Sequence, residues 1–600
     1  MDDRLERVES TVGDLERALA AIEQRLAALE RERGVLAAPA PPPQPDDEVW
    51  APPHVARDEF IAILSFAGRS FVALGGAYLL RALTDSAILP QAAGIALGLA
   101  YALSWLVMAD RVGAAGERVR RESASRELAV SGFPSPGPGT GSRTHAVSAA
   151  FHGVVFSIIA FPLLWEATVR FKYLSPDATA AALTLVTALA FGVAVRQRLQ
   201  ALAWIVTLTA LSAALGLIGA TAIVAPFAAF LVVLGVATLW LGYANKWVVL
   251  RWPVAFVADV AVLALTLRMS NSAWAEPTLR VVAVQLLLLN GYLASIVVRT
   301  LVRARDVNGF EIVQSVAALG VGFGGTVYVA RLTGSGVGVL ALVNLAFGAG
   351  CYAVAFRFIA RREGLQRNFY FYTSLALILI LVSSALLLSR ASLAPACAAL
   401  AVISTWAAER VNRVALVWHG AVYLIVAGAA SGLLAAAGRA LVGPVTTAWD
   451  PFMPPAIITL AAAAVCWMLP RPAGARTPVF SESLPRLLVA TVLFWSVGGW
   501  LVGLATPPLS GTPGAGADAG IVATIRTTVL AVAALALAWI GRHDRFRESA
   551  WLLYPVLMWG GLKLVLEDLP QSKPATLFVA LALYGGALIF APRISHHRTV

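Results

Sequence analysis

The stretch "FAGRSFVALGGAYLLRALTD", Phe66 to Asp85, begins a series of apolar segments that continues almost to the end of the chain. Each segment is about 18 to 25 residues long, enough for a helix to cross a hydrocarbon core of about 30 Å. Arg69 and Arg81 nevertheless lie inside this first segment. A charged side chain is costly in hydrocarbon, so both arginines need a partner or a path to water.

The composition is that of a membrane protein. Of the 600 residues, 59% are hydrophobic and 13% are charged, whereas a soluble domain is nearer half apolar and a quarter charged. Strand-like alternation of apolar and polar residues is absent from the sequence, which disfavours an outer-membrane barrel. We therefore predict an all-α fold, a polytopic membrane bundle of about 18 transmembrane helices. The predicted span centres lie near residues 71, 99, 158, 187, 210, 232, 258, 290, 320, 347, 379, 400, 424, 462, 495, 531, 559 and 584.

The positive charge is distributed as expected for a multi-pass protein. The net charge is +12. If the N-terminus is cytoplasmic, the cytoplasmic loops hold about 27 Arg or Lys and the opposite loops about 9, a bias that sets orientation. Both termini are then expected in the cytoplasm. No basic stripe with interleaved aromatic residues occurs, so we expect membrane lipids as partners and no nucleic acid.

The first 36 residues carry a heptad pattern with apolar residues spaced alternately by three and four. This pattern, sustained over about four heptads, predicts a coiled coil and hence a homo-oligomer. Antiparallel pairing and a single helix remain alternatives, and no buried Asn specifies the number of chains. The predicted oligomerisation residues are Leu5, Val8, Val12, Leu15, Leu19, Ile22, Leu26 and Leu29.

Changes in composition divide the chain further. A stretch rich in proline favours extended polyproline II and serves as a semi-rigid spacer. A long loop rich in Gly, Ser and Pro after the second span is expected to be partly disordered. The predicted parts are a cytoplasmic coiled coil (1–36), a Pro-rich linker (37–57), a first transmembrane hairpin (58–109), a cytoplasmic loop (110–145), a transmembrane helix array (146–592) and a cytoplasmic tail (593–600).

The coiled coil, the proline-rich spacer and the Gly-rich first span "GRSFVALGGAYLLRALTD" (68–85) together resemble a family of bacterial predicted membrane proteins of unknown function. The opening of the ninth span, "NGFEIVQSVAALGVGFGG" (308–325), is similar in kind. The resemblance implies a location in the bacterial inner membrane. It implies no catalytic or binding residue.

Arg69 and Arg81 differ in how easily they are explained. Arg81 lies near the outer end of the first span, four residues before Asp85, with which it can pair on one helix face. Arg69 lies in the inner half. It can extend to the inner surface, pair with a carboxylate inside the bundle, or take part in transport.

Asp259 and Asn290 lie at similar depth in two consecutive spans, near the middle of the membrane. An ionised carboxylate at that depth costs roughly 2.5 kcal/mol or more. We expect the two side chains to meet, as an ion or proton site or as a single interhelical hydrogen bond with Asp259 protonated. Asn344, in the tenth span, is expected to hydrogen-bond another helix.

A second group of charged residues lies in the outer thirds of three spans. Lys563 and Glu567 are four residues apart and can pair within one helix, or the group can line an outward-facing polar vestibule. The members of this outer polar group are Glu166, Arg526, Lys563 and Glu567.

The segment "GVGFGG", Gly320 to Gly325, matches a dinucleotide-binding pattern but lies inside an apolar span, so a cofactor is rejected. Close helix packing or an unwound segment lining a cavity explains it instead. The sequence contains no CxxC pair, no metal-ligand spacing and no paired carboxylates in its outer loops. We therefore expect no enzyme, no cofactor and no metal.

Two functions fit these observations. The first is a transporter or carrier of a small or lipid-like substrate, with Asp259, Asn290 and Arg69 in its pathway. The second is a non-catalytic membrane scaffold that oligomerises through its N-terminal coiled coil. Several costly intramembrane charges favour the first.

Overall fold

The computed structural model describes residues 72, 75–131, 140–271, 273, 276–360, 366–470 and 480–596. The predicted coiled coil, the Pro-rich linker and Arg69 lie outside these residues and stay predictions. The chain divides into two compact units, Met1–Val72 and Ala73–Val600, and all described residues except Val72 belong to the second.

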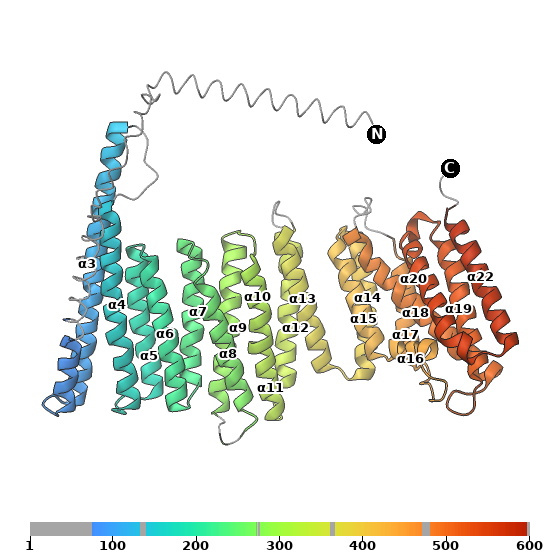
Figure 1. Ribbon diagram of the computed structural model, residues 1–600, viewed down its shortest axis with the longest axis horizontal. Coiled ribbons are helices and arrows are strands. Elements are labelled where there is room, and N and C mark those ends of the chain that lie inside the picture. The colour runs from blue at the N-terminus through green and yellow to red at the C-terminus, as the bar shows by residue number, and fades with distance from the viewer. Residues whose placement is uncertain are drawn as a thin grey trace, which may run out of the picture. The chain divides into compact units, whose positions relative to one another are not determined.

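The described residues form helices and no strands, as predicted (Figure 1). Residues 75–85 are helical. Helices that follow one another in the chain pack together, for example α3 on α4, α7 on α8 and α12 on α13. The α-helices up to α13 are α3 (Gln91–Ser131), α4 (Thr140–Val169), α5 (Pro176–Arg196), α6 (Gln200–Thr221), α7 (Ala225–Asn245), α8 (Arg251–Arg268), α9 (Thr278–Val297), α10 (Gly309–Ala317), α11 (Gly324–Leu332), α12 (Val337–Val354) and α13 (Gln366–Leu387).

The C-terminal part has the same character, with α14 packed on α15 and α19 in contact with α18, α20 and α22. Its α-helices are α14 (Arg390–Val411), α15 (Val414–Ala430), α16 (Leu433–Val442), α17 (Pro454–Met468), α18 (Phe480–Ser510), α19 (Ala519–Ile540), α20 (Glu548–Lys563), α21 (Leu569–Gln571) and α22 (Pro574–His596). Four π-helical turns, η1 (Val298–Val302), η2 (Ala318–Phe323), η3 (Ala355–Ile359) and η5 (Leu564–Asp568), and one 3₁₀ turn, η4 (Asp544–Phe546), complete the described elements.

Several helices begin where the sequence provides a cap. Ser175 precedes Pro176, and its Oγ accepts a hydrogen bond of 3.2 Å from the Ala178 amide at the start of α5. At the start of α10, Asn308 and Glu311 form a capping box, with bonds of 3.1 and 2.8 Å between each side chain and the other residue's amide.

The helices are those of a polytopic membrane protein. Within the described residues, 14 helices are long and apolar enough to cross a membrane, or up to 15 if the bent pair α15–α16 is one span. The predicted count of about 18 is therefore not confirmed. The 14 helices match 14 of the predicted centres, and the remaining four centres have individual causes.

The first of these four centres, near residue 71, lies where the described residues begin. The second is α8, which carries three charged side chains in 18 residues. The third is α15, which has 17 residues and forms an angle of 70° with α16. The fourth is α17, with only 15 residues.

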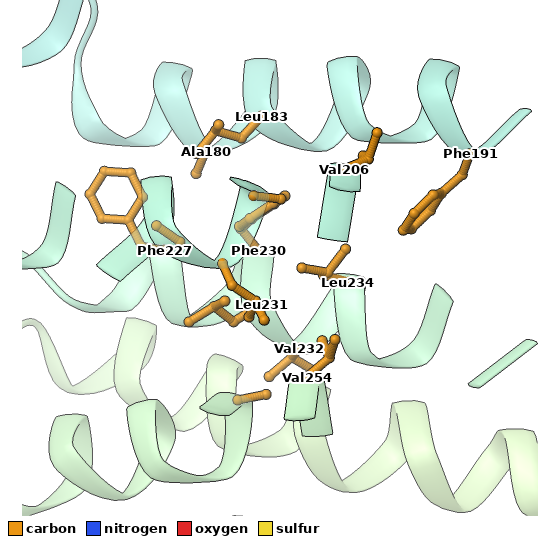
Figure 2. Packing of buried hydrophobic residues seen from close by; sticks show 14 of the residues in the cluster. Ala180, Leu183, Phe191, Val206, Phe227, Phe230, Leu231, Val232, Leu234 and Val254 are labelled. Carbon is orange, nitrogen blue, oxygen red and sulfur yellow. The ribbon is translucent and has the colours of Figure 1, made fainter. Parts of the chain in front are cut away.

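The most buried of the 14 helices is α7, in which 61% of the 18-residue apolar stretch is buried inside the protein. It packs against α5, α6, α8 and α9, and Figure 2 shows the interlocking side chains of this core. The labelled residues are Ala180, Leu183, Phe191, Val206, Phe227, Phe230, Leu231, Val232, Leu234 and Val254. A separate buried cluster, whose buried members run from Leu377 to Leu493, forms the core of the C-terminal part.

The glycines of "GVGFGG" allow close helix packing, as predicted. A β-carbon on Gly322 would lie 2.9 Å from the Gln285 carbonyl oxygen on α9, and one on Gly325 would lie 2.8 Å from Gln285 Nε2. The contact lets Gln285 donate a 2.8 Å hydrogen bond to Thr266 Oγ1 on α8. The backbone remains helical here, as π-turn η2 followed by α11, so this segment joins three closely packed helices.

We expect Gly322→Ala to destabilise the protein, because its methyl group would overlap the α9 backbone. A cost of about 1–3 kcal/mol is typical of overpacking. Gly320→Ala, two residues away in the same π-turn, is the matched control, because a β-carbon there meets no described atom within 4 Å. Thermal unfolding of the purified protein in detergent measures both variants, and equal midpoints would contradict the packing assignment.

Candidate functional site

Three of the four predicted outer polar residues come together in one buried cluster. Arg526 Nη1 donates a 2.6 Å hydrogen bond to Glu567 Oε1. Lys563 Nζ lies 3.7 Å from Glu567 Oε2 and 2.7 Å from Asp568 Oδ2. Arg526 and Lys563 are only 2% and 5% exposed. We call Arg526, Lys563, Glu567 and Asp568 the charged cluster.

A π-helical turn explains how Lys563 reaches two acids. Glu567 and Asp568 lie in η5, directly after the end of α20 at Lys563. A π-turn brings residues five apart into register, so Lys563 contacts Asp568 as well as Glu567. Thr527 on α19 connects the same groups, since it accepts a 2.8 Å bond from Lys563 Nζ and donates a 2.9 Å bond to Asp568 Oδ2.

Asp518 fixes the start of α19, the helix that carries Arg526. Its Oδ1 accepts hydrogen bonds of 2.9 and 3.2 Å from the Gly520 and Ile521 amides. The 2.8 Å hydrogen bond from Lys573, reinforced by that from the Ile521 amide, holds the pKa of Asp518 below its usual value. The N-terminus of α19 is thereby capped by a carboxylate that stays charged at neutral pH.

Arg526 also completes the end of another helix. Its Nε donates a 2.8 Å bond to the Ala440 carbonyl, and its Nη2 donates a 2.6 Å bond to the Gly443 carbonyl. These oxygens belong to the end of α16, where helical carbonyls lack intrahelical partners. The guanidinium carbon lies 5.2 Å from the centre of the Trp449 ring. One arginine therefore neutralises Glu567 and satisfies a helix terminus inside the protein.

The charged cluster contains two cations and two anions, so its charges balance. Asp568 is fully buried, and its Oδ1 has no hydrogen-bond partner among the described residues. Buried ionisable groups that share partners are typical of proton and ion pathways in membrane proteins. Among the described residues, no group of three or more His, Cys, Asp or Glu is placed to hold a metal ion.

Glu166 does not join this cluster; the sequence placed it at a similar depth but did not predict a contact with the other three residues. Glu166 Oε1 lies 2.9 Å from Arg81 Nη2. Arg81 Nε lies 3.8 Å from Asp85 Oδ2, which confirms their predicted pairing, and Arg170 Nη1 lies 3.2 Å from the same oxygen. Similar depth along the membrane normal does not make two helices neighbours.

A groove lies beside the Arg81–Glu166 pair. Its volume is about 250 Å³, and its walls come from the helix at residues 75–85, from α3 and from α4. The lining is mainly apolar, with the ion pair as its charged part. Its residues include Tyr78, Ile95, Ile158, Leu163, Pro162 and Phe171.

Asp259 and Asn290 do not meet, so their predicted pairing is wrong. Gln314 Nε2 on α10 donates a 3.1 Å hydrogen bond to Asp259 Oδ1. Asn290 is exposed and donates a 2.8 Å bond to the Leu286 carbonyl of its own helix. The reason is geometric, because α8 packs against α10 as well as α9, and Asn290 faces away from both the Asp259 contact and the interior.

Gln314 is one of the residues that the sequence did not predict as part of a site. It is 3% exposed and lies in the stretch "EIVQSVAA" that opens the span containing α10. A buried amide in an apolar span signals an interhelical hydrogen bond. Asn344 was recognised by that signal and is confirmed, since its Nδ2 donates bonds of 2.9 Å to the Leu379 carbonyl and 2.8 Å to Ser383 Oγ on α13.

We expect Arg526→Leu to lower the free energy of unfolding by about 3–5 kcal/mol, because it removes a buried cation that pairs with Glu567 and leaves the Ala440 and Gly443 carbonyls without their donor. Arg439→Leu is the matched control, since Arg439 pairs with Asp450 at an exposed site and such pairs contribute about 0–1 kcal/mol. Denaturant unfolding in detergent compares the two variants. Similar losses would show that the charged cluster is not the buried network described here.

Comparisons with known proteins provide no identification. No family model matches the chain, and neither a curated protein nor a solved structure matches it. The membership of a bacterial family of unknown function therefore stays a proposal. What the protein does must follow from its own residues.

Proposed function

We propose that this protein is a membrane carrier for a lipid-like substrate in the bacterial inner membrane. The observation that carries the proposal is the apolar groove beside Arg81 and Glu166. An amphipathic molecule needs an apolar surface for its chain and charged groups for its head. The groove offers both within one site.

The dimensions and charges of the groove favour such a substrate. A volume of about 250 Å³ accommodates part of an acyl chain and is too small for a drug-sized ligand of the usual kind. Arg81 and Glu166 are 41% and 16% exposed at their side chains, so a headgroup can reach them. Arg81 supplies the cation at this site, and an arginine guanidinium suits a headgroup that carries phosphate.

The buried ionisable groups fit the same proposal. Polar and charged groups lie inside otherwise apolar helices at two places, namely Asp259 with Gln314 and the charged cluster. Such residues are costly and are a default sign of function. Arg69 remains a candidate for the pathway on sequence grounds alone, and Asn290 is an exposed residue outside the Asp259 contact.

We expect Ile158→Trp to slow lipid movement about tenfold or more, because Ile158 lines the groove and an indole ring would fill it. Leu185→Trp is the matched control, since Leu185 is an exposed apolar residue on α5 that does not line the groove. The assay is the transbilayer movement of fluorescent phosphatidylglycerol in vesicles containing the purified protein. The carrier proposal fails if wild-type vesicles move the lipid no faster than protein-free vesicles.

The heptad pattern of residues 1–36 favours a second candidate, a non-catalytic scaffold that oligomerises through its coiled coil. We expect deletion of residues 1–36 to lower the oligomeric state, because the apolar seam would be removed. Light scattering of the detergent-solubilised protein measures the mass. An unchanged mass, together with full rescue of a deletion strain by the truncated chain, would remove the support for a scaffold.

A further inference from the structure

The corner between α7 and α8 contains a buried arginine that has no hydrogen-bond partner among the described residues. Arg251 is the first residue of α8 and is 7% exposed. Its Nε is buried, and its guanidinium makes no hydrogen bond to any other described residue. The guanidinium carbon lies 4.4 Å from the centre of the Phe310 ring. Stacking on the ring orients the guanidinium but leaves its buried Nε donor without a hydrogen-bond acceptor.

A second unfilled donor lies at the same corner. Asn245 is the last residue of α7, and its Nδ2 is buried with no partner among the described residues. Gly242, one turn earlier on α7, faces the Arg251 side chain, since a β-carbon there would lie 3.8 Å from Arg251 Cδ. Gly242 and Asn245 are three residues apart and therefore share one face of α7. Because Gly242 on this face contacts the Arg251 side chain, Asn245 and Arg251 lie on the same side of the corner.

The start of α8 adds to the positive potential. Leu250 at the N-cap provides no side-chain hydrogen bond, and the first turn contains no acidic residue. The amide groups of a helix N-terminus carry a partial positive charge that attracts anions. In this 18-residue helix that charge lies next to the Arg251 guanidinium.

The nearby acid is already committed to other partners. Glu311 forms an ion pair with Arg299, accepts a 2.6 Å bond from the Tyr243 hydroxyl and accepts a 2.8 Å bond from the Asn308 amide. Two arginines therefore face one carboxylate, and the corner keeps an excess of one positive charge. Lys246 and Arg303 are both exposed, so they are not counted in this excess.

We propose that this corner is a binding site for a phosphate-type oxyanion, either free or on a lipid headgroup. Arg251 supplies the charge, and the Asn245 amide and the α8 N-terminus supply further donors. A singly charged oxyanion neutralises the excess charge and fills donors that would otherwise stay unpaired in a buried place. The site involves different helices from the groove and does not depend on the proposed carrier function.

The test is the shift in thermal unfolding of the full-length protein in detergent as inorganic phosphate is added, with chloride at equal ionic strength as reference. A ligand that binds only the folded state raises the midpoint in a saturable way. We expect Arg251→Gln to weaken phosphate binding about 10- to 100-fold, the usual loss for a charged hydrogen bond. Arg268→Gln, at the other end of α8, is the matched control and should bind like the wild type.

Asn245→Asp is the second variant, because it keeps the shape of the side chain and places a negative charge at the site. We expect it to weaken binding at least tenfold, so it tests the site even if Arg251→Gln does not fold. Nanodiscs of phosphatidylcholine and of phosphatidylglycerol distinguish the two possible sources of the anion, a free phosphate and a lipid headgroup. A phosphate response in both kinds indicates a free anion, and a response blocked by phosphatidylglycerol indicates a headgroup.

Two results would overturn the site. One is wild-type affinity for phosphate in Arg251→Gln or Asn245→Asp. The other is the lack of any saturable phosphate effect in detergent combined with equal stability in the two kinds of nanodisc.

Discussion

Hydrocarbon offers no hydrogen bonds, and this constraint governs how the helices of this chain begin and end. At several termini that lie inside the protein, a charged side chain from another segment completes the helix. Arg526 on α19 binds the last carbonyls of α16. Glu276 accepts the Val224 and Ala225 amides at the start of α7, at 2.7 and 3.2 Å. Charge in this molecule therefore replaces the water that a soluble helix terminus would use.

The same arrangement recurs around α17, an apolar helix of only 15 residues. Arg486 on α18 donates bonds of 3.0 and 3.1 Å to the Trp467 and Leu469 carbonyls at the end of α17, and a 2.9 Å bond to Glu548 on α20. Arg486 and Arg526 thus act alike, each closing a short helix and pairing with a glutamate. A buried ion pair gains little by itself, because desolvation offsets attraction. Here the arginine has a further structural role, since the carbonyls would otherwise be unpaired.

The sequence predicts the helical architecture well because span length and hydropathy depend only on composition along the chain. Fourteen predicted centres match apolar helices of sufficient length. Hydropathy gives the depth of a residue but neither the rotation of its helix nor the identity of its neighbours. Asp259 therefore received the wrong partner, and Glu166 was grouped by depth with residues that it does not contact. Asp568 was missed because contact with Lys563 requires a π-turn, which a regular helical period does not predict.

The charged cluster and the Arg81–Glu166 pair differ in how readily they can rearrange. To separate α16 from α19, the protein must break the bonds from Arg526 to the α16 carbonyls and its ion pair with Glu567. This is costly because Arg526 is almost fully buried. To open the groove, it must separate Arg81 from Glu166, where Arg81 is 41% exposed and Asp85 offers a second partner. Exposed pairs contribute little and exchange easily. Under the proposed carrier function, the movement that admits a substrate is therefore expected around α3 and α4, with the charged cluster as a rigid support.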